Sequence, residues 1–125
     1  MTVLSKRKND RGQAALFGAL GLPGLRQGED IVTASEERTL IASIDRTALS
    51  PFRFHGWEGK RLTISFGWRY DFDTGSFDPT DPIPDWLWPL REKAARFAGV
   101  RPDELVQALL IRYDPGASIG WHRDR

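Results

Sequence analysis

Apolar and polar residues alternate almost without interruption between residues 61 and 72. A strand would place the large apolar side chains on one face, namely Leu62, Ile64, Phe66, Trp68, Tyr70 and Phe72. The other face would carry Arg61, Thr63, Ser65, Arg69 and Asp71. A period of two is that of a half-buried strand. The pattern therefore predicts one strand over residues 61–72, or two strands that join near Gly67.

A helical pattern precedes this strand, over about residues 34–46. Leu40, Ile41 and Ile44 have the spacing of an apolar helix stripe. Thr33 and Glu36 have the spacing of an N-terminal capping box. We expect regular structure to end after this helix, at Ser50-Pro51.

A second amphipathic helix is predicted over about residues 86–98. Its buried stripe would consist of Trp86, Leu90, Ala94 and Phe97. Asp85 is the expected N-cap, and Pro89 falls in the first turn, where its missing N–H is tolerated. Gly99 provides a stop.

The remaining segments complete the predicted organisation. Residues 1–20 form a basic, loose N-terminal segment, and residues 14–30 are rich in glycine and read as an irregular entry. Residues 73–84 form a loop, a strand follows at 106–113, and a turn at 114–116 leads to an extended piece at 118–124. Residues 21–125 would then form one α+β domain, with helices before most of the strands.

Composition narrows the class of protein. The chain of 125 residues contains no cysteine, which excludes a disulfide partner, thiolate metal sites and cysteine nucleophiles. It holds no apolar run of membrane-spanning length and no hydrophobic signal core, so we expect no membrane partner and a cytoplasmic location. Five Trp and seven Phe are many for this length, and aromatic rings serve both as core fillers and as stacking surfaces.

His122 and Asp124 are the candidate metal ligands. On an extended segment, side chains two residues apart point to the same side, so an imidazole and a carboxylate converge. They would fill two corners of a facial triad of the kind that holds Fe(II). The tripeptide alone is weak, because a surface His and Asp with ordinary hydrogen bonds give the same pattern. Neither the protein-kinase catalytic loop nor an acid–base pair fits, since their further motifs are missing.

The residues around this tripeptide are more specific. Residues 108–124, ALLIRYDPGASIGWHRD, contain a strand ending in Tyr, a Pro-Gly turn and a segment bearing His-x-Asp. This stretch closely resembles the signature of the AlkB-type Fe(II)/2-oxoglutarate-dependent dioxygenases. Residues 59–61, 66–70 and 83–85 resemble the family's substrate-lid strands and following helix, and residues 22–25 with the 34–46 helix resemble its opening. The resemblance covers about residues 20–125 in order.

The resemblance implies a function and a set of roles. The cofactors would be Fe(II) and 2-oxoglutarate, with dioxygen as co-reactant, and the reaction would be oxidative demethylation of alkylated DNA or RNA bases, although some members act on protein side chains. His122 and Asp124 would ligate iron, with no separate catalytic residue, and Tyr113 would contact 2-oxoglutarate. Ile111 stands where the best-known members have an Asn that also contacts the cosubstrate, and an apolar side chain cannot make that bond. Trp68, Tyr70 and Arg123 would lie near the substrate.

The same resemblance implies a fold that this sequence covers in part. A double-stranded β-helix, or jelly roll, with N-terminal helices packed on the sheet would be interrupted just after His-x-Asp. In the family a third ligand, His, and an Arg that clamps 2-oxoglutarate follow further downstream. The chain would therefore be a truncated N-terminal portion, unstable alone, and His55 would lie in a surface loop. The alternatives are a non-catalytic remnant or binding module, or an unrelated cupin-type jelly roll.

Overall fold

The computed structural model describes residues 22–123. The chain divides into two compact units, residues 1–31 and residues 32–125, and each is described by itself. Residues 22–31 of the first unit contain no helix or strand, and the Leu25 N–H donates to the Leu22 carbonyl across a turn at 3.2 Å. The irregular entry predicted for this stretch is confirmed there. The predicted loose segment, residues 1–20, lies outside the described residues.

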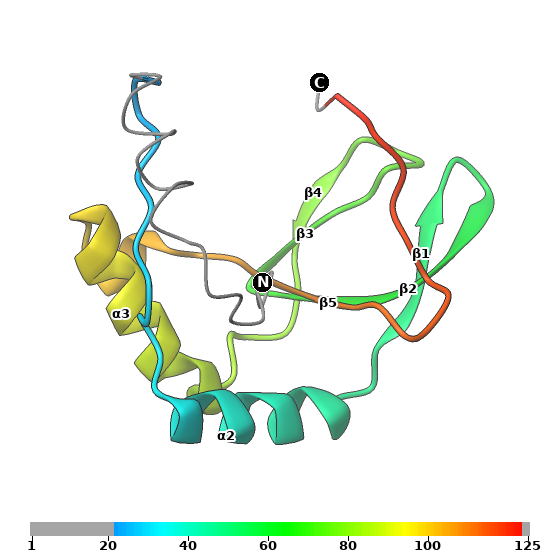
Figure 1. The fold of residues 1–125 in the computed structure, drawn as a ribbon. Helices are drawn as coiled ribbons and strands as arrows, with labels where there is room; N and C mark the ends of the chain where they lie inside the picture. Colours follow the sequence, from blue (N-terminus) through cyan, green and yellow to red (C-terminus); the bar gives the residue numbers. More distant parts are fainter. Residues whose placement is uncertain (1–21, 124–125) are drawn as a thin grey trace. The chain divides into compact units, whose positions relative to one another are not determined.

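The second unit is an α+β structure, as predicted (Figure 1). Its elements in chain order are α2 (Ala34–Asp45), β1 (Ser50–Phe54), β2 (Trp57–Phe66), β3 (Trp68–Tyr70), β4 (Phe77–Pro79), η1 (Asp85–Leu87), α3 (Trp88–Ala98), η2 (Pro102–Glu104) and β5 (Ala108–Arg112). The strands form an antiparallel sheet of order β1-β2-β5 and a separate β3-β4 pair. The double-stranded β-helix itself stays a prediction. No helix among residues 22–123 has the length and apolarity needed to span a bilayer.

Helix α2 begins where the capping signal placed it. The Glu36 N–H donates to the Thr33 hydroxyl at 3.1 Å, and that hydroxyl donates to the Glu36 carboxylate at 3.2 Å. Leu40 is buried and Ile44 is half-buried, as the stripe predicted. Ile41 is 47% exposed, so its predicted place in the stripe is wrong. Ser43, one turn from Leu40, is buried instead, so the packed face of the helix is centred on Leu40 and Ser43.

The second predicted helix is divided into two parts. η1 covers Asp85–Leu87 with Pro84 as its N-cap, so Asp85 is the first helical residue and not the cap. Pro89 falls in the first turn of α3, and Gly99 ends the helix in the left-handed region at φ 74°, both as predicted. The most buried residue is Ala95, whereas Ala94 of the predicted stripe is only half-buried.

Strand β1 is a feature that the sequence prediction missed. Ser50-Pro51, expected to end regular structure, starts a strand that pairs with β2. Proline is tolerated there because β1 lies at the edge of the sheet. The two-residue turn between β1 and β2 is His55-Gly56, and both residues have positive φ, 46° and 78°, as tight hairpin turns require. The loop position expected for His55 is confirmed.

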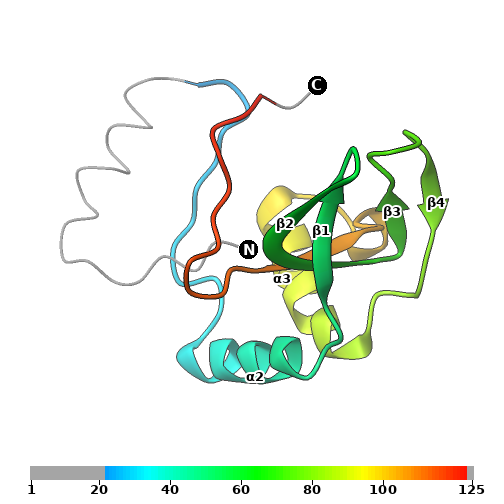
Figure 2. The same ribbon diagram turned by 90° about the vertical axis from the view of Figure 1, so that its right-hand side faces the viewer.

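Ile64 and Phe66 of the predicted apolar face belong to the core, whereas Leu62 does not and residues 61–65 are all half-buried. The register pairs Ile64 with Leu110 and Phe66 with Ala108, so these side chains share one face. That face packs on the core formed by Leu40, Phe66 and Leu87, with Val32, Ile64, Ile83, Trp86, Leu90, Ala108 and Leu110 around it. Both views show α2 running beneath the β1-β2 hairpin (Figures 1 and 2).

The alternation breaks at Gly67, and the two-strand interpretation of residues 61–72 is the right one. Gly67 has φ 79°, its N–H donates to the Asp81 carbonyl at 2.6 Å, and its carbonyl accepts from the Thr80 N–H at 3.0 Å. The chain then pairs with β4, which lies inside the predicted loop 73–84. Phe66 therefore faces the core, whereas Tyr70 and Phe72 line a groove elsewhere.

The C-terminal segment is less regular than predicted. β5 spans Ala108–Arg112, shorter at both ends than the expected 106–113. The turn after it is present, with the Ala117 N–H donating to the Asp114 carbonyl at 2.8 Å. Residues 118–123 pair with no strand in the described part of the chain, so the extended strand predicted over 118–124 is not formed there.

One ion pair joins the two helices. The Lys93 ammonium donates to both carboxylate oxygens of Glu36 at 2.8 and 2.7 Å. This hydrogen bond is the main cause that holds the pKa of Glu36 below its ordinary value, and the charge of Lys93 and the Thr33 cap act in the same direction. Glu36 thus serves the helix cap and the contact with α3 together.

The Gly67→Ala variant should be clearly destabilised. A non-glycine residue in the left-handed region costs about 1–2 kcal/mol, and the new Cβ would collide with the carbonyl oxygen of Val106. We expect urea denaturation to show a loss of about 2 kcal/mol or more. Gly116→Ala is the matched control, because Gly116 has φ 86° but nothing lies within 4 Å of a Cβ there. Equal losses in the two variants would contradict the steric explanation.

A second prediction concerns the acid side of the stability profile. Because the folded-state pKa of Glu36 is lowered, its stabilisation is present above the unfolded-state pKa and is lost as pH falls through the folded-state value. Glu36→Gln should therefore lower the urea midpoint at neutral pH and match the wild type near about pH 3. Lys93→Met should behave alike. If the urea midpoints of wild type and variant still differed in acid, the ionised Glu36–Lys93 pair would not be the source of the stabilisation.

Candidate functional site

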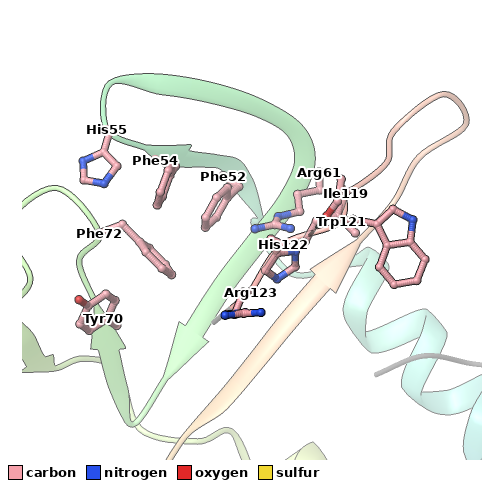
Figure 3. A pocket seen from close by; sticks show the side chains of 11 residues that line it. Phe52, Phe54, His55, Arg61, Tyr70, Phe72, Ile119, Trp121, His122 and Arg123 are labelled. Atoms are coloured by element: carbon pink, nitrogen blue, oxygen red, sulfur yellow. Dashed lines mark hydrogen bonds between the residues drawn. The ribbon is translucent and has the colours of Figure 1, made fainter. Parts of the chain in front are cut away.

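A groove lies on the second unit, between the β1-β2 hairpin, the residues that follow β3, and residues 119–123 (Figure 3). Its volume is about 1180 Å³, which is on the large side for a small-molecule pocket. The lining residues are Phe52, Phe54, His55, Arg61, Tyr70, Phe72, Ile119, Gly120, Trp121, His122 and Arg123. Aromatic and basic side chains dominate this list.

Phe72 is the centre of the aromatic part of the groove. Its ring lies 5.3 Å from Phe52, 5.7 Å from Phe54 and 4.9 Å from Tyr70, measured between centroids. All three contacts are edge-to-face, the arrangement that the ring quadrupoles favour. The rings of Phe54, Tyr70 and Phe72 keep 41–45% of their surface exposed. The cluster is therefore ordered by its own contacts but open to a ligand.

Two local devices bring these rings together. Between the pairs Pro51–Leu62 and Arg53–Glu58, one residue of β1, Phe52, lies opposite residues 59–61 of β2, and this bulge bends β2 at that point. After β3, the carboxylate of Asp71 accepts from the N–H groups of Asp73 and Thr74 at 2.8 and 3.1 Å. These bonds, that from Thr74 first, hold the pKa of Asp71 below its ordinary value. They fix the turn that starts at Phe72.

Arg61 supplies the nearest positive charge to the rings. Its guanidinium carbon lies 3.9 Å from the centroid of Phe52, a cation–π contact. The Nε atom of Arg61 is buried and has no hydrogen-bond partner. The sequence pattern placed Arg61 on the polar side of the strand, which is the side of the sheet opposite the core.

His122 lies on the C-terminal side of the groove (Figure 3). Its Nδ1 atom is 2.9 Å from the carbonyl oxygen of Gly120. A carbonyl can only accept, so Nδ1 carries the proton in this hydrogen bond. A backbone hydrogen bond of this type is the common way in which a metal-binding histidine is oriented.

The predicted site residues are gathered only in part. Tyr70, His122 and Arg123 line the groove together. Trp68 lies outside its lining and stacks on Phe77 at 5.2 Å, with an angle of 6° between the rings. Tyr113 follows β5, is 43% exposed, and is not among the lining residues either. Asp124, the second predicted ligand, lies outside the described residues.

The described residues were compared with the predicted metal site. Within residues 22–123, no three His, Cys, Asp or Glu side chains lie close enough together to hold a metal ion. The sequence contains two histidines, and His55 stands against Phe54 in the hairpin turn, with 4.3 Å between the ring centroids. The imidazoles of the described groove lining are therefore His55, in the hairpin turn, and His122, which the Gly120 carbonyl orients.

The sequence prediction missed Phe52, Phe54 and Arg61 as groove residues. A signal was present, because Phe52 and Phe54 are two residues apart and precede His55-Gly56, a pair suited to a tight turn. Recognition of that hairpin would have paired the Phe-rich strand with residues 57–66. The bulge of β2 opposite Phe52 has no comparable signal in the sequence.

Comparison with protein-family models, with curated proteins and with solved structures found no match to this chain.

The aromatic contacts should be energetically coupled. In a double-mutant cycle with Phe52→Leu and Phe72→Leu, we expect a coupling of about 0.5–1.5 kcal/mol, measured by urea denaturation, because each single substitution removes the same edge-to-face contact. The control cycle pairs Phe72→Leu with Trp57→Leu, whose ring is 76% exposed. That cycle should show a coupling near zero. Additive losses for Phe52 and Phe72 would mean that the rings do not support one another.

Proposed function

We propose that this chain carries the substrate groove and the first metal ligands of an AlkB-type Fe(II)/2-oxoglutarate-dependent dioxygenase that demethylates alkylated bases of DNA or RNA. The observation that supports it best is the position of His122. The residue that the sequence resemblance assigns to iron opens on the same groove as the Phe52, Phe54, Tyr70 and Phe72 rings. The metal at His122 would thus lie next to the aromatic rings that bind a planar substrate.

His122 and Asp124 would be the residues of this chain that hold Fe(II). His122 would bind the metal through Nε2, and its ring is oriented by the Gly120 carbonyl. Asp124 follows two residues later as the proposed second ligand, and a facial triad takes one more histidine. When bound, Fe(II) with 2-oxoglutarate and dioxygen supplies the oxidant that hydroxylates an N-methyl group, which is then lost as formaldehyde.

Tyr113 is the residue proposed to contact 2-oxoglutarate. It follows β5, whose register places Ile111 opposite Thr63, on the face that carries Arg61 and not the core. By the period of two, Tyr113 continues the same face. Ile111 offers no hydrogen bond there, so the hydroxyl of Tyr113 would be the polar contact from this strand.

The aromatic groove has a separate task in this proposal, which is to hold the planar part of the substrate. Base–aromatic stacking contributes about 1–3 kcal/mol per base in proteins that bind single strands. The partly exposed rings of Phe54, Tyr70 and Phe72 offer such surfaces beside His122. Apolar walls would also keep water away from the metal side of the groove.

A non-catalytic binding module is the second candidate. One observation favours it: the aromatic and basic walls of the groove would bind a planar ligand without any metal. Such a module would bind its ligand in the same groove, and neither Fe(II) nor 2-oxoglutarate would change its affinity. The Fe(II) affinities of the variants His122→Ala and His55→Ala distinguish the dioxygenase from the binding module.

Anaerobic titration with Fe(II) and 2-oxoglutarate, followed by the charge-transfer absorbance, tests the dioxygenase proposal. We expect saturable binding that His122→Ala weakens at least about tenfold, because a first ligand is lost. His55→Ala is the matched control: it removes the other histidine of the chain, also from the groove lining, and should leave the metal affinity unchanged.

The opposite results would decide for the alternative. If the wild type shows no saturable band, or if His55→Ala and His122→Ala weaken it alike, His122 is not a specific ligand and the binding module remains. Circular dichroism of both variants guards against a trivial loss of folding.

A further inference from the structure

The position of Arg61 is not explained by the packing of the protein alone. Its guanidinium rests on the Phe52 ring at 3.9 Å, at the wall of the groove. The Nε atom is withdrawn from solvent without a hydrogen-bond partner. A buried donor left unpaired costs about 1–3 kcal/mol, and a cation–π contact at a partly exposed site returns about 0.5–1 kcal/mol. The contact with Phe52 therefore offsets only part of the cost of placing Arg61 at the groove wall.

The charge of the groove indicates what that group is. Arg61 and Arg123 bring positive charge to its lining, and none of the lining residues found in the described chain is Asp or Glu. The whole chain is nearly neutral, with a formal net charge of +1, so this bias is local. A cationic ligand could use the rings through cation–π contacts, but it would be repelled by both guanidinium groups and would find no carboxylate in this lining. An anionic ligand would be attracted.

The neighbouring rings narrow the ligand further. Figure 3 shows the Arg61 guanidinium beside Phe52, on the side of the groove toward His122 and Arg123, with Phe54, Phe72 and Tyr70 beyond it. A small dicarboxylate would use the charge but not the aromatic surfaces. A single nucleic acid strand uses both, since its phosphates pair with guanidinium groups and its bases stack on rings.

We propose that Arg61 contacts a backbone phosphate of a single-stranded nucleic acid in this groove, with Phe52 holding its guanidinium plane. The phosphate would accept from the outer N–H groups of the Arg61 guanidinium, and the adjacent base would lie against the Phe72 side of the groove. Arg61 is thus a positioning residue for the substrate strand. This assignment rests on the proposed function for its choice of ligand, but it requires neither iron nor 2-oxoglutarate.

The test is binding of a fluorescently labelled single-stranded oligonucleotide to the full chain, without metal, over a range of salt concentrations. Each phosphate contact on a single strand contributes about 0.7 to the slope of log K against log salt. We expect Arg61→Ala to reduce the slope by about that amount and to weaken binding at low salt about tenfold. Arg61→Lys keeps a charge but not the planar fork, and should restore the slope with part of the affinity.

Arg53→Ala is the matched control. Arg53 lies on β1 of the same hairpin, its side chain is 75% exposed, and it pairs with Glu58 at 3.7 Å outside the groove lining. We expect it to change the slope little. The thermal unfolding of each variant shows whether Arg61→Ala still folds, and Arg61→Lys carries the test if it does not.

Three results would overturn the proposal. The wild type does not bind the oligonucleotide, Arg61→Ala leaves the slope unchanged, or Arg53→Ala reduces it as much as Arg61→Ala does. These results are independent of the metal titration. If the chain does not bind the oligonucleotide but His122→Ala still weakens Fe(II) binding, only the role of Arg61 is excluded. If the chain binds the oligonucleotide through Arg61 but His122→Ala does not change Fe(II) binding, the dioxygenase is excluded and a nucleic acid-binding groove remains.

Discussion

The left-handed backbone of Gly67 is the constraint on which the groove depends. β2 packs its apolar side chains on the helices as far as Phe66. If the strand continued with the same alternation, Tyr70 and Phe72 would follow Phe66 onto the core face. Gly67, with φ 79° and both backbone groups bonded to residues 80 and 81, sends the chain into the β3-β4 pair instead. The rings then meet Phe52 and Phe54 on the other side of the sheet.

The two faces of the β1-β2-β5 sheet divide stability from function. One face buries Phe66, Ile64 and Leu110 against α2, η1 and α3, and the Glu36–Lys93 pair joins the helices behind it. The other face carries Arg61 and leads to the groove. Its aromatic side chains stay partly exposed because they pack on one another edge-to-face and not under a further layer of the described chain.

The metal and the strand-binding proposals use different sides of one groove. His122 and Arg123 come from the segment after β5, while Arg61 and Phe52 come from the edge hairpin. The sheet register fixes the hairpin side, through the pairing of Pro51 with Leu62 and of Leu62 with Arg112. The His122 side depends on a segment without strand pairing, in which the Gly120 carbonyl sets the orientation of the ring.

Local patterns were enough to predict the α+β class, both helices with the Thr33 cap and the Gly99 stop, and the core positions of Ile64 and Phe66 on β2. These features depend on local periods and on single capping contacts, which a sequence shows directly. The packing of distant segments was needed to show that Ser50-Pro51 begins an edge strand, that Ile41 is outside the core, and that Arg61 rests on Phe52. Those outcomes depend on which strand pairs with which, on a shift in register and on one left-handed glycine. Each involves residues distant in the chain or a backbone angle that the pattern of apolar residues does not encode.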